Sequence, residues 1–375
     1  MKLLFVVSGL GRGGAEEQVV LLARELSRLG HQVGIYSLSR RTERLPELEG
    51  SGVEVVVDDK RGALDPAVLW RLRRHVRRAR PELVHSFGYD ADVYARLAGQ
   101  GSPVPVLNSE RTDDQRVSRV QHLGYRLTSM LCDGVVANTR AGAEFARRLH
   151  RLGAERVDVL GNAIDLEAVD RRIARSSRPA HAVLPGAGLK RLCMVASISP
   201  VNDHPLALRV LRRLRETDPA WRLLCVGEAP AASGAHREHV LAECNRLGLG
   251  EFVSFVGHRS DVIELIASSE LLLITARHGG YPLVALEAMA CNTPVVSTDW
   301  GEVRRLLPDA AQVVASRDEA EIAAAVAACH NRRAAISAAQ RRWAEQHGTA
   351  AAAAAALLAV YRKHLLAGDA RMEPA

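Results

Sequence analysis

The chain has 375 residues, of which 47% are hydrophobic, 25% charged and only 4% aromatic. These proportions exclude a disordered or fibrous protein, and the length allows two domains with a core each. The formal net charge is +7, and residues 1–180 carry 29 of the 50 basic and 23 of the 43 acidic side chains. The basic excess therefore belongs to the first half, where it suits an anionic membrane surface, a phosphate-bearing substrate or nucleic acid.

Short apolar runs alternate with helical patterns along the first half. The expected strands are 3–7, 33–37, 83–87, 104–108 and 134–138, and the expected helices are 15–29, 66–79 and 90–98. Alternation of this kind is typical of βαβ units that build a parallel sheet.

The same rhythm returns in the second half. Its expected strands are 191–197, 222–227, 253–257, 271–275 and 294–298, its expected helices are 205–216, 235–247 and 283–290, and one long helix is expected over 334–366. The sequence thus predicts an α/β protein with two doubly wound, Rossmann-like domains that face each other across a cleft. The expected domains are 1–170 and 189–345, with a linker over 171–188 and a C-terminal helix over 346–375 that packs back toward the first domain.

The six cysteines form no CxxC pair, so the sequence signals neither a zinc site nor a redox motif. We expect free, buried thiols in a reducing compartment. The chain starts with a strand-like run without a signal-peptide pattern, and the longest apolar stretch, 350–361, is too short to span a bilayer. We therefore expect a cytoplasmic protein, at most peripheral on the inner face of the cytoplasmic membrane.

A glycine-rich loop follows the first expected strand. Gly9, Gly11 and Gly14 match GxGxxG literally, but a nicotinamide enzyme would also need an acid after the second strand, where the sequence has Arg40. A plain tight turn is the second alternative. We favour a loop in which the missing Cβ atoms of Gly13 and Gly14 let a phosphate or a sugar approach the backbone.

A second glycine pair, Gly279-Gly280, lies between the strand 271–275 and the helix 283–290. The free N–H groups and the positive end of the helix dipole would face the cleft. Glu287 lies further along the helix, and its carboxylate can accept two hydrogen bonds, as paired ribose hydroxyls require. The alternative is that Glu287 is an ordinary helix-face residue.

Eight strings spread over the chain resemble glycosyltransferase family 4, the retaining, sugar-nucleotide-dependent transferases of the GT-B fold, also called glycosyl transferases group 1. They are GGAE (13–16), VHSF (84–87), VDVLGNAID (157–165), VASISPVNDHPLAL (195–208), CVGEAP (225–230), VSFVGHRSDV (253–262), GGYPLVALEAMA (279–290) and TPVVSTDWGEV (293–303). The resemblance implies that the second domain holds a nucleoside diphosphate sugar, that the first holds the acceptor, and that no metal or other cofactor is needed.

The resemblance also assigns the donor site. The backbone of Gly280, Tyr281, Pro282 and Leu283 would touch the donor's sugar and phosphates, and Glu287 would hold the ribose. The other expected donor-binding positions are Ser197, Asn202, Gly227, Arg259 beside the base, and Arg277.

Three of these positions depart from the family pattern. The family usually has an arginine and a lysine where this chain has Ser197 and Asn202, and a glutamate near the transferred sugar where it has Gly279. A charge-assisted hydrogen bond contributes about 1.5–3 kcal/mol, so two missing cations cost about 3–6 kcal/mol unless other groups replace them. Arg259 and Arg277 are candidates for that role, with a surface or structural role as the alternative.

In the first domain, His85 lies near the end of the expected strand 83–87, and Glu110 and Arg111 follow the expected strand 104–108. His85 is expected to point toward the cleft and to orient the acceptor, or else to be a satisfied histidine at the edge of the core. Glu110 is a candidate acceptor base and Arg111 a candidate partner for an anionic acceptor, with a surface ion pair as the alternative. The arginine-rich segment 69–80 is expected to be a helix packed on the sheet, or else a contact for anionic lipid.

The leading hypothesis is a retaining glycosyltransferase that moves a sugar from a nucleoside diphosphate sugar to a growing, lipid-linked polysaccharide or glycolipid. The alternative is a catalytically degenerate homologue that binds a sugar nucleotide or a partner protein without turnover. No nucleic-acid partner is expected, because the chain lacks a recognisable binding module and interleaved aromatic residues.

Overall fold

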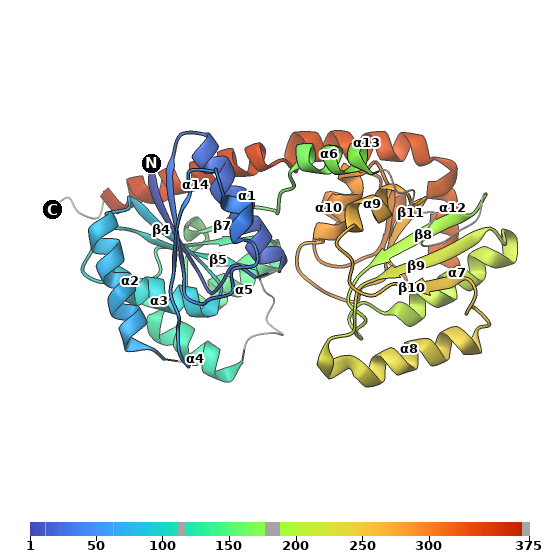
Figure 1. Ribbon diagram of the computed structural model, residues 1–375, viewed down its shortest axis with the longest axis horizontal. Coiled ribbons are helices and arrows are strands. Elements are labelled where there is room, and N and C mark those ends of the chain that lie inside the picture. The colour runs from blue at the N-terminus through green and yellow to red at the C-terminus, as the bar shows by residue number, and fades with distance from the viewer. Residues whose placement is uncertain (12, 63, 112–117, 177–187, 370–375) are drawn as a thin grey trace. The chain divides into compact units, whose positions relative to one another are not determined.

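The computed structural model of the protein describes residues 1–11, 13–62, 64–111, 118–176 and 188–369 (Figure 1). They form two compact units: residues 1–163 with helix α14 (Ala350–Asp369), and Ile164–Thr349. The linker predicted over 171–188 falls mostly on 177–187, outside the described residues. Residues 171–175 belong to helix α6 (Leu166–Arg175) of the second unit.

The first unit is built on a seven-stranded parallel sheet in the order β3-β2-β1-β4-β5-β6-β7. The strands are β1 (Lys2–Val7), β2 (Gln32–Ser37), β3 (Glu54–Val57), β4 (Leu83–Phe87), β5 (Val106–Glu110), β6 (Gly134–Ala137) and β7 (Val157–Val159). The five predicted strands are confirmed, and β5 begins only after Pro105, which has no N–H for the ladder. The sequence does not predict the edge strands β3 and β7, because runs of four and three residues are too short to show a period.

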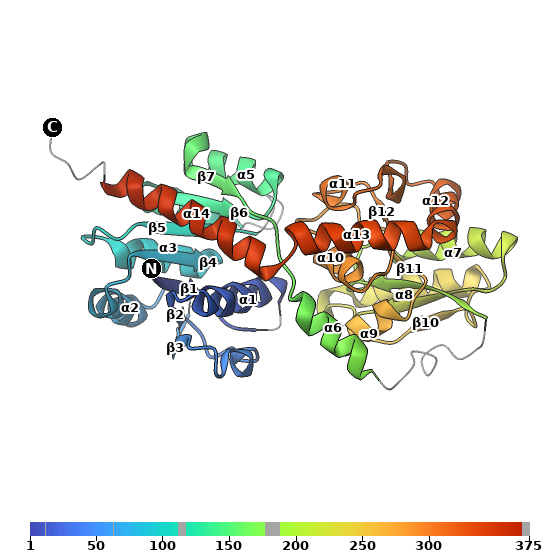
Figure 2. The same cartoon turned by 90° about the horizontal axis from the view of Figure 1, so that it is seen from above.

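Helices cover both faces of this sheet. They are α1 (Gly14–Arg28), α2 (Pro66–Ala79), α3 (Tyr89–Gly99), α4 (Arg119–Thr128) and α5 (Arg140–His150), together with α14. Helices α1 and α14 share a core with Phe5 of β1, whereas α2 and α3 share a core with Leu4 and Val6. Both views show α14 beside α1 (Figures 1 and 2). The alternation along β1 is the period of a strand that is buried on both faces.

Helix α2 contains the arginine-rich segment. Asp65 caps its first turn by accepting two backbone hydrogen bonds, and Pro66 supplies a preset φ at the first position. Val68, Leu72 and Val76 form its buried face. The segment is therefore a helix packed on the sheet, with its arginines around that apolar face.

The second unit contains a six-stranded parallel sheet in the order β10-β9-β8-β11-β12-β13. The strands are β8 (Lys190–Val195), β9 (Trp221–Val226), β10 (Val253–Phe255), β11 (Leu271–Ile274), β12 (Val295–Thr298) and β13 (Val313–Val314). One face is covered by α6, α9 (Val262–Ala267), α10 (Leu283–Ala290) and α13 (Arg333–His347), and the other by α7 (His204–Thr217), α8 (Gly234–Arg246) and α12 (Glu319–Asn331). The prediction of two parallel α/β sheets is confirmed.

The single helix predicted over 334–366 is in fact two, α13 and α14, interrupted at Gly348 and Thr349. The carbonyl oxygen of Gly348 accepts a hydrogen bond from the N–H of Ile164 at 2.8 Å, and a Cβ added at Gly348 would lie 2.7 Å from Cδ1 of Leu286. A tertiary contact therefore interrupts an apolar pattern that runs on through the sequence. Among the described helices, α14 included, none is both long and apolar enough to cross a membrane.

The strand order reverses once in each sheet, between β1 and β4 and between β8 and β11. At such a switch point the loops after neighbouring strands diverge and leave a crevice at the carboxyl end of the sheet, where ligands bind in open α/β proteins. The candidate residues of each unit lie in or near these loops.

Candidate active site

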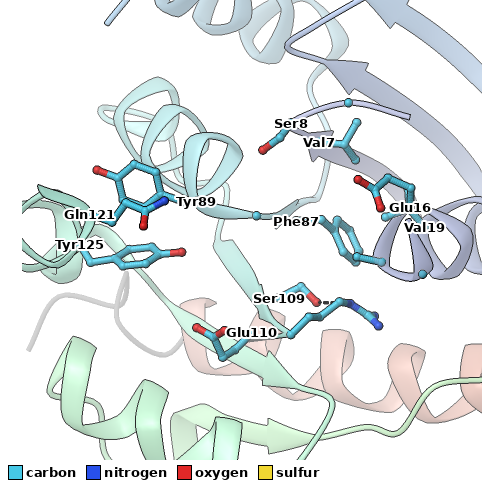
Figure 3. Close-up of a pocket in the computed structure, with 15 residues that line it drawn as sticks. Val7, Ser8, Glu16, Val19, Phe87, Tyr89, Ser109, Glu110, Gln121 and Tyr125 are labelled. Atoms are coloured by element: carbon cyan, nitrogen blue, oxygen red, sulfur yellow. Dashed lines mark hydrogen bonds between the residues drawn. The ribbon is translucent and has the colours of Figure 1, made fainter. Parts of the chain in front are cut away.

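The first unit has a pocket of 480 Å³ at its switch point. It lies at the carboxyl ends of β1, β4 and β5, against the first turn of α1 and one side of α4 (Figure 3). Its lining includes Ser8, Gly14, Glu16, Phe87, Tyr89, Glu110, Arg111, Gln121 and Tyr125. Tyr89, Gln121 and Tyr125 form one wall, and Glu16, Val19 and Phe87 lie across from them (Figure 3).

Arg111 supplies the cation of this pocket. Its guanidinium donates to Oδ1 of Asn162 at 2.6 Å and to Oγ of Ser109 at 3.1 Å, and it lies over the Phe87 ring. No carboxylate of a described residue forms an ion pair with it. Burial lowers the pKa of Arg111 to about 10, so the side chain is still charged at neutral pH. A partly buried cation whose partners among the described residues are neutral is a favourable place for an anion.

A buried polar network positions the tyrosine wall. Asp92 accepts hydrogen bonds from the hydroxyl of Tyr125 at 2.9 Å, from Ser86 at 2.6 Å and from the amide of Asn108 at 3.0 Å. Arg96, one turn along α3, is fully buried. Burial raises the pKa of Asp92 to about 6, although these partners and Arg96 oppose the shift. The network fixes Tyr125, and with it α4, against the sheet.

The glycine loop is placed as the sequence suggests, but an acid lies over it. Gly13 is the N-cap of α1 and has no side-chain capping bond. A Cβ added at Gly13 would overlap the carboxylate of Glu16, which folds back over the helix start. A carboxylate at this end of a helix already interacts with the dipole, so the loop is better suited to hydroxyl groups than to a phosphate.

The orientation predicted for His85 is wrong. His85 is 1% exposed, and its Nδ1 lies 2.7 Å from the hydroxyl of Tyr361 on α14. The strand continues to Phe87, and alternation along it turns Leu83, His85 and Phe87 into the layer beneath α1 and α14. His85 is therefore part of the core, and we propose no role for it in the reaction.

Burial of His85 predicts an acid-sensitive fold. Desolvation lowers its pKa to about 3, whereas the unfolded chain takes up the proton near pH 6.5. Stability linked to His85 is therefore lost as pH falls below 6.5, by about 1.4 kcal/mol per pH unit. In urea titrations at several pH values, the free energy of unfolding of His85→Phe should fall less steeply with acid than that of the wild type, by about 1.4 kcal/mol per pH unit. Tyr361→Phe should keep the wild-type pH dependence. Parallel pH profiles for all three proteins would contradict the assignment.

In the second unit, Gly227 lies at the end of β9 with a φ of 135°. A Cβ at this position would overlap the carbonyl of Ala196, which follows β8. Because both partners are backbone atoms, neither can move aside cheaply. Only glycine fits, and the loops after β8 and β9 come together there.

Ser197 and Asn202, the two positions that lack the expected cations, contact each other. The Asn202 amide donates to the carbonyl oxygen of Ser197 at 2.8 Å and to its hydroxyl at 3.1 Å. These neutral groups hold the loop after β8 closed on itself. They bring no positive charge to it.

Two arginines from other loops lie next to this pair. The guanidinium groups of Arg277, which follows β11, and of Arg317, which follows β13, each lie 2.6 Å from Oδ2 of Asp203. Arg317 also donates to the carbonyl oxygens of Thr275 and Ala276. The cluster of Asp203, Arg277 and Arg317 carries a formal charge of +1 beside Asn202. Sequence reasoning misses Arg317, because nothing in its local pattern relates it to a residue more than a hundred positions away.

Asp203 is predicted to be important for stability. It is buried at φ 48°, it caps α7 by accepting from the N–H of Leu206, and it receives both arginines. Asp203→Ala should lower the free energy of unfolding by about 2–4 kcal/mol, because the cap and two charged hydrogen bonds are lost. Asp203→Asn, which keeps the cap, should lose about half as much in a urea titration. A loss within about 0.5 kcal/mol for the alanine variant would show that the cluster is not structural.

Gly279 lies against an aromatic ring. A Cβ at Gly279 would lie 2.8 Å from Cζ3 of Trp300, and a Cβ at Gly301 would lie 2.5 Å from the carbonyl oxygen of Gly280. The loop with Trp300 thus packs on the glycine pair where the family pattern has a carboxylate. The sequence does not predict this, since Trp300 belongs to a different loop.

The remaining donor candidates lie around the start of α10 and before α9. Pro282 is buried, Tyr281 and Glu287 are partly buried, and the N–H of Leu283 is used by the carbonyl oxygen of Tyr281 at 2.9 Å. Leu283 is thus less available to a ligand than the sequence suggests. Arg259 forms a bidentate ion pair with Asp261, at 2.7 and 2.8 Å. As donor-binding residues, all of these stay predictions.

The cysteines are free and buried, as predicted. Among the described residues, no group of three or more His, Cys, Asp or Glu side chains could hold a metal ion.

Comparison with known proteins identifies the class of protein. Residues 12–168 match the family model described as Glycosyltransferase Family 4, and residues 189–332 match the model described as Glycosyl transferases group 1. The two-sheet architecture and these matches define a glycosyltransferase of the GT-B type. The chain belongs to the family 4-like glycosyltransferases of that group.

Relatives are distant but cover most of the chain. A D-inositol 3-phosphate glycosyltransferase of Streptosporangium roseum is 24% identical over 79% of this chain and 75% of its own length. A D-inositol 3-phosphate glycosyltransferase 2 of Catenulispora acidiphila is 25% identical over 84% of this chain and 81% of its own length.

Solved structures share the fold. Anabaena Alr3699/HepE in complex with UDP superposes with a TM-score of 0.80 at 19% identity, covering 96% of this chain and 100% of that one. Sucrose-phosphate synthase from Thermosynechococcus elongatus gives a TM-score of 0.78 at 15% identity, covering 98% and 100%.

Proposed function

We propose that the protein transfers a sugar from a nucleoside diphosphate sugar, bound by the second unit, to a hydroxyl group of a phosphate-bearing acceptor, bound by the first, with retention of configuration. The observation that carries the proposal is Arg111, a partly buried cation without a carboxylate partner among the described residues, in the switch-point pocket. Glu110 lies in the same pocket and is 5% exposed, which suits a base for the acceptor hydroxyl.

The proposed reaction breaks the bond between the anomeric carbon and the donor's diphosphate and forms a bond to the acceptor oxygen on the same face of the sugar. The acceptor proton passes to Glu110 or to the departing diphosphate. N–H groups at Gly280 and Tyr281 would stabilise the charge of the leaving group, and the cluster of Asp203, Arg277 and Arg317 would replace the missing arginine and lysine. Glu287 would hold the ribose. No metal or other cofactor takes part in this proposal.

Two kinds of acceptor share the required chemistry. The relatives are named for an inositol phosphate, and a lipid-linked glycan also carries phosphate beside hydroxyl groups. We propose the lipid-linked glycan, as part of a growing polysaccharide or glycolipid, because the basic excess of the chain lies in its first half. The protein would then act on the inner face of the cytoplasmic membrane.

The test is a panel of nucleoside diphosphate sugars that begins with UDP-glucose, since Alr3699/HepE is held in complex with that sugar nucleotide. Each donor is offered with inositol phosphate and, separately, with a polyprenyl-diphosphate-linked sugar in detergent. Release of nucleoside diphosphate and the product's anomeric configuration by NMR are the readouts. Transfer to the lipid-linked acceptor with retention supports the proposal. Transfer to inositol phosphate alone overturns its acceptor half, and inversion overturns its stereochemical half.

One observation favours the degenerate alternative. Asn202 bonds to Ser197, and Trp300 covers Gly279, so three positions of the family pattern are filled by neutral contacts. On this reading the wild type binds a sugar nucleotide in calorimetry and turns none over. A variant with Ser197→Arg and Asn202→Lys would then gain activity, whereas adding Gly279→Glu would require a smaller residue at position 300.

A further inference from the structure

Helix α4 and the turn that follows it expose a row of large apolar side chains. Val120, Leu123, Leu127 and Met130 are 77%, 59%, 75% and 93% exposed. Spacings of three, four and three residues put them on one face of α4 and of the 3-10 turn Ser129–Leu131. We call this row the α4 stripe. It holds four of the eleven large hydrophobic residues that the described part of the chain exposes.

The opposite face of α4 makes the polar contacts. Tyr125 donates to the buried Asp92 at 2.9 Å, and the hydroxyl of Thr128 accepts from the buried Arg96 at 3.1 Å. A surface helix normally turns its apolar face inward and its polar face outward. Here the arrangement is inverted. Rotating α4 to bury the stripe would break bonds to two buried charged groups, so its outward orientation is fixed by the fold.

The surroundings of the stripe are basic. Residues 118–151 include six arginines but only two carboxylates, those of Asp133 and Glu144. Arg126 lies among the stripe residues, is exposed, and forms no ion pair with another described side chain. Helix α5 packs beside α4 (Figure 1). It adds the exposed Arg147 and Arg148, two cations that share the single carboxylate of Glu144. An apolar row flanked by cations suits a surface in which apolar groups lie beneath a layer of anionic groups.

We propose that the α4 stripe inserts into the interface of a membrane that contains anionic lipid. The apolar side chains would enter the headgroup and acyl boundary, and the arginines would contact lipid phosphates. This inference deepens the proposed transfer to a lipid-linked acceptor and rests on it. The same helix carries Gln121 and Tyr125 into the pocket that contains Arg111, so membrane contact at α4 would bring the pocket to the level of the acceptor's headgroup.

Helix α2 is the less suitable surface, although it is richer in arginine. Its Arg71 is paired with Asp58 at 2.7 Å, and Arg73 donates to the carbonyl oxygen of Gln100. Trp70 is the one large apolar residue of α2 that is exposed, so this helix offers charge without a row of apolar side chains. A protein partner fits the α4 stripe less well, because it would have to cover the apolar row and also neutralise the arginines around it.

The experiment is cosedimentation of the full chain with vesicles of phosphatidylcholine and phosphatidylglycerol. Leu123→Gln/Leu127→Gln should lower the partition coefficient at least about tenfold, because two side chains no longer insert. The matched control, Leu64→Gln/Leu366→Gln, removes two leucines that are 81% and 71% exposed elsewhere in the same unit, and should bind like the wild type. Added salt or vesicles of phosphatidylcholine alone should weaken wild-type binding.

Equal partitioning of the stripe variant and the wild type overturns the inference. Wild-type binding that is equally strong on neutral vesicles also overturns it. So does a wild type that is a dimer in analytical ultracentrifugation and binds no vesicles, if the stripe variant is a monomer. Leu123 and Leu127 do not line the pocket, so the stripe variant should keep wild-type transfer to a soluble phosphate acceptor. If the stripe variant loses vesicle binding and the wild type transfers no sugar to any acceptor, the membrane role of the α4 stripe is supported. Only the proposed function is then refuted.

Discussion

Replacing Glu287 by alanine is expected to lower kcat/KM for the donor about 10²- to 10⁴-fold. The carboxylate would accept two hydrogen bonds from the ribose, and two charge-assisted hydrogen bonds contribute about 3–6 kcal/mol together. Glu287→Gln keeps one oxygen that can accept a hydrogen bond, so its kcat/KM should fall only about tenfold. Steady-state kinetics at saturating acceptor, with calorimetry of the nucleoside diphosphate sugar, measures both variants.

Glu270→Gln is the matched control for this prediction. Glu270 is also a partly buried carboxylate of the second unit, but it lies before the amino end of β11 and pairs with Arg333. Its loss should leave donor kinetics unchanged. Equal kinetics for Glu287→Ala and the wild type, with an unchanged melting temperature, would show that Glu287 is an ordinary helix-face residue.

Replacing Arg111 by glutamine is expected to raise the KM for a phosphate-bearing acceptor about 10- to 100-fold, with a smaller change in kcat. The guanidinium is partly buried and has only Asn162 and Ser109 as hydrogen-bond partners among the described residues. It can therefore donate a charged hydrogen bond to the acceptor's phosphate, which contributes about 1.5–3 kcal/mol and is lost in the variant. Arg111→Lys keeps the charge but loses the paired N–H groups of the planar guanidinium. Its KM should therefore lie between those of the wild type and Arg111→Gln. Initial rates at varied acceptor concentration give the two constants.

Two controls make the interpretation specific. Arg24→Gln removes an exposed arginine from α1 in the same unit and should leave the KM unchanged. An acceptor analogue without phosphate should bind the wild type and Arg111→Gln equally. A loss that is the same for both acceptors would mean that Arg111 supports the pocket wall and does not bind phosphate.

Most of the fold could be predicted from the sequence because its signals are local. Strands such as β1 and β4 are short apolar runs bounded by turns, and the alternation with helices requires parallel sheets. The exceptions have two causes, one local and one tertiary. Edge strands β3 and β7 are too short for a period, and the break at Gly348 depends on contacts with Ile164 and Leu286.

The candidate sites were less predictable, because chemistry depends on neighbours that are distant in the chain. Strand position placed Arg111 at the carboxyl end of the sheet, but only the fold shows that it lacks a carboxylate partner among the described residues. His85 was expected at the end of its strand, yet it lies in the middle of β4, and pleating turns it beneath Tyr361 and into the core. Arg317 and Trp300 reach the expected donor loops from other strands, and no local pattern predicts either contact.

The sequence by itself therefore determined the class: two parallel α/β sheets and the family 4-like motifs. The donor site in the loops after β8 and β11 stays a prediction. Periodicity and spacing are properties of neighbouring residues, and one chain displays them directly. Tertiary structure alone decided which charges are paired, which side chains are buried, and that α4 turns its apolar face outward. Those properties depend on how distant segments pack, because the pKa of a group and the cost of exposing it are set by whatever lies against it.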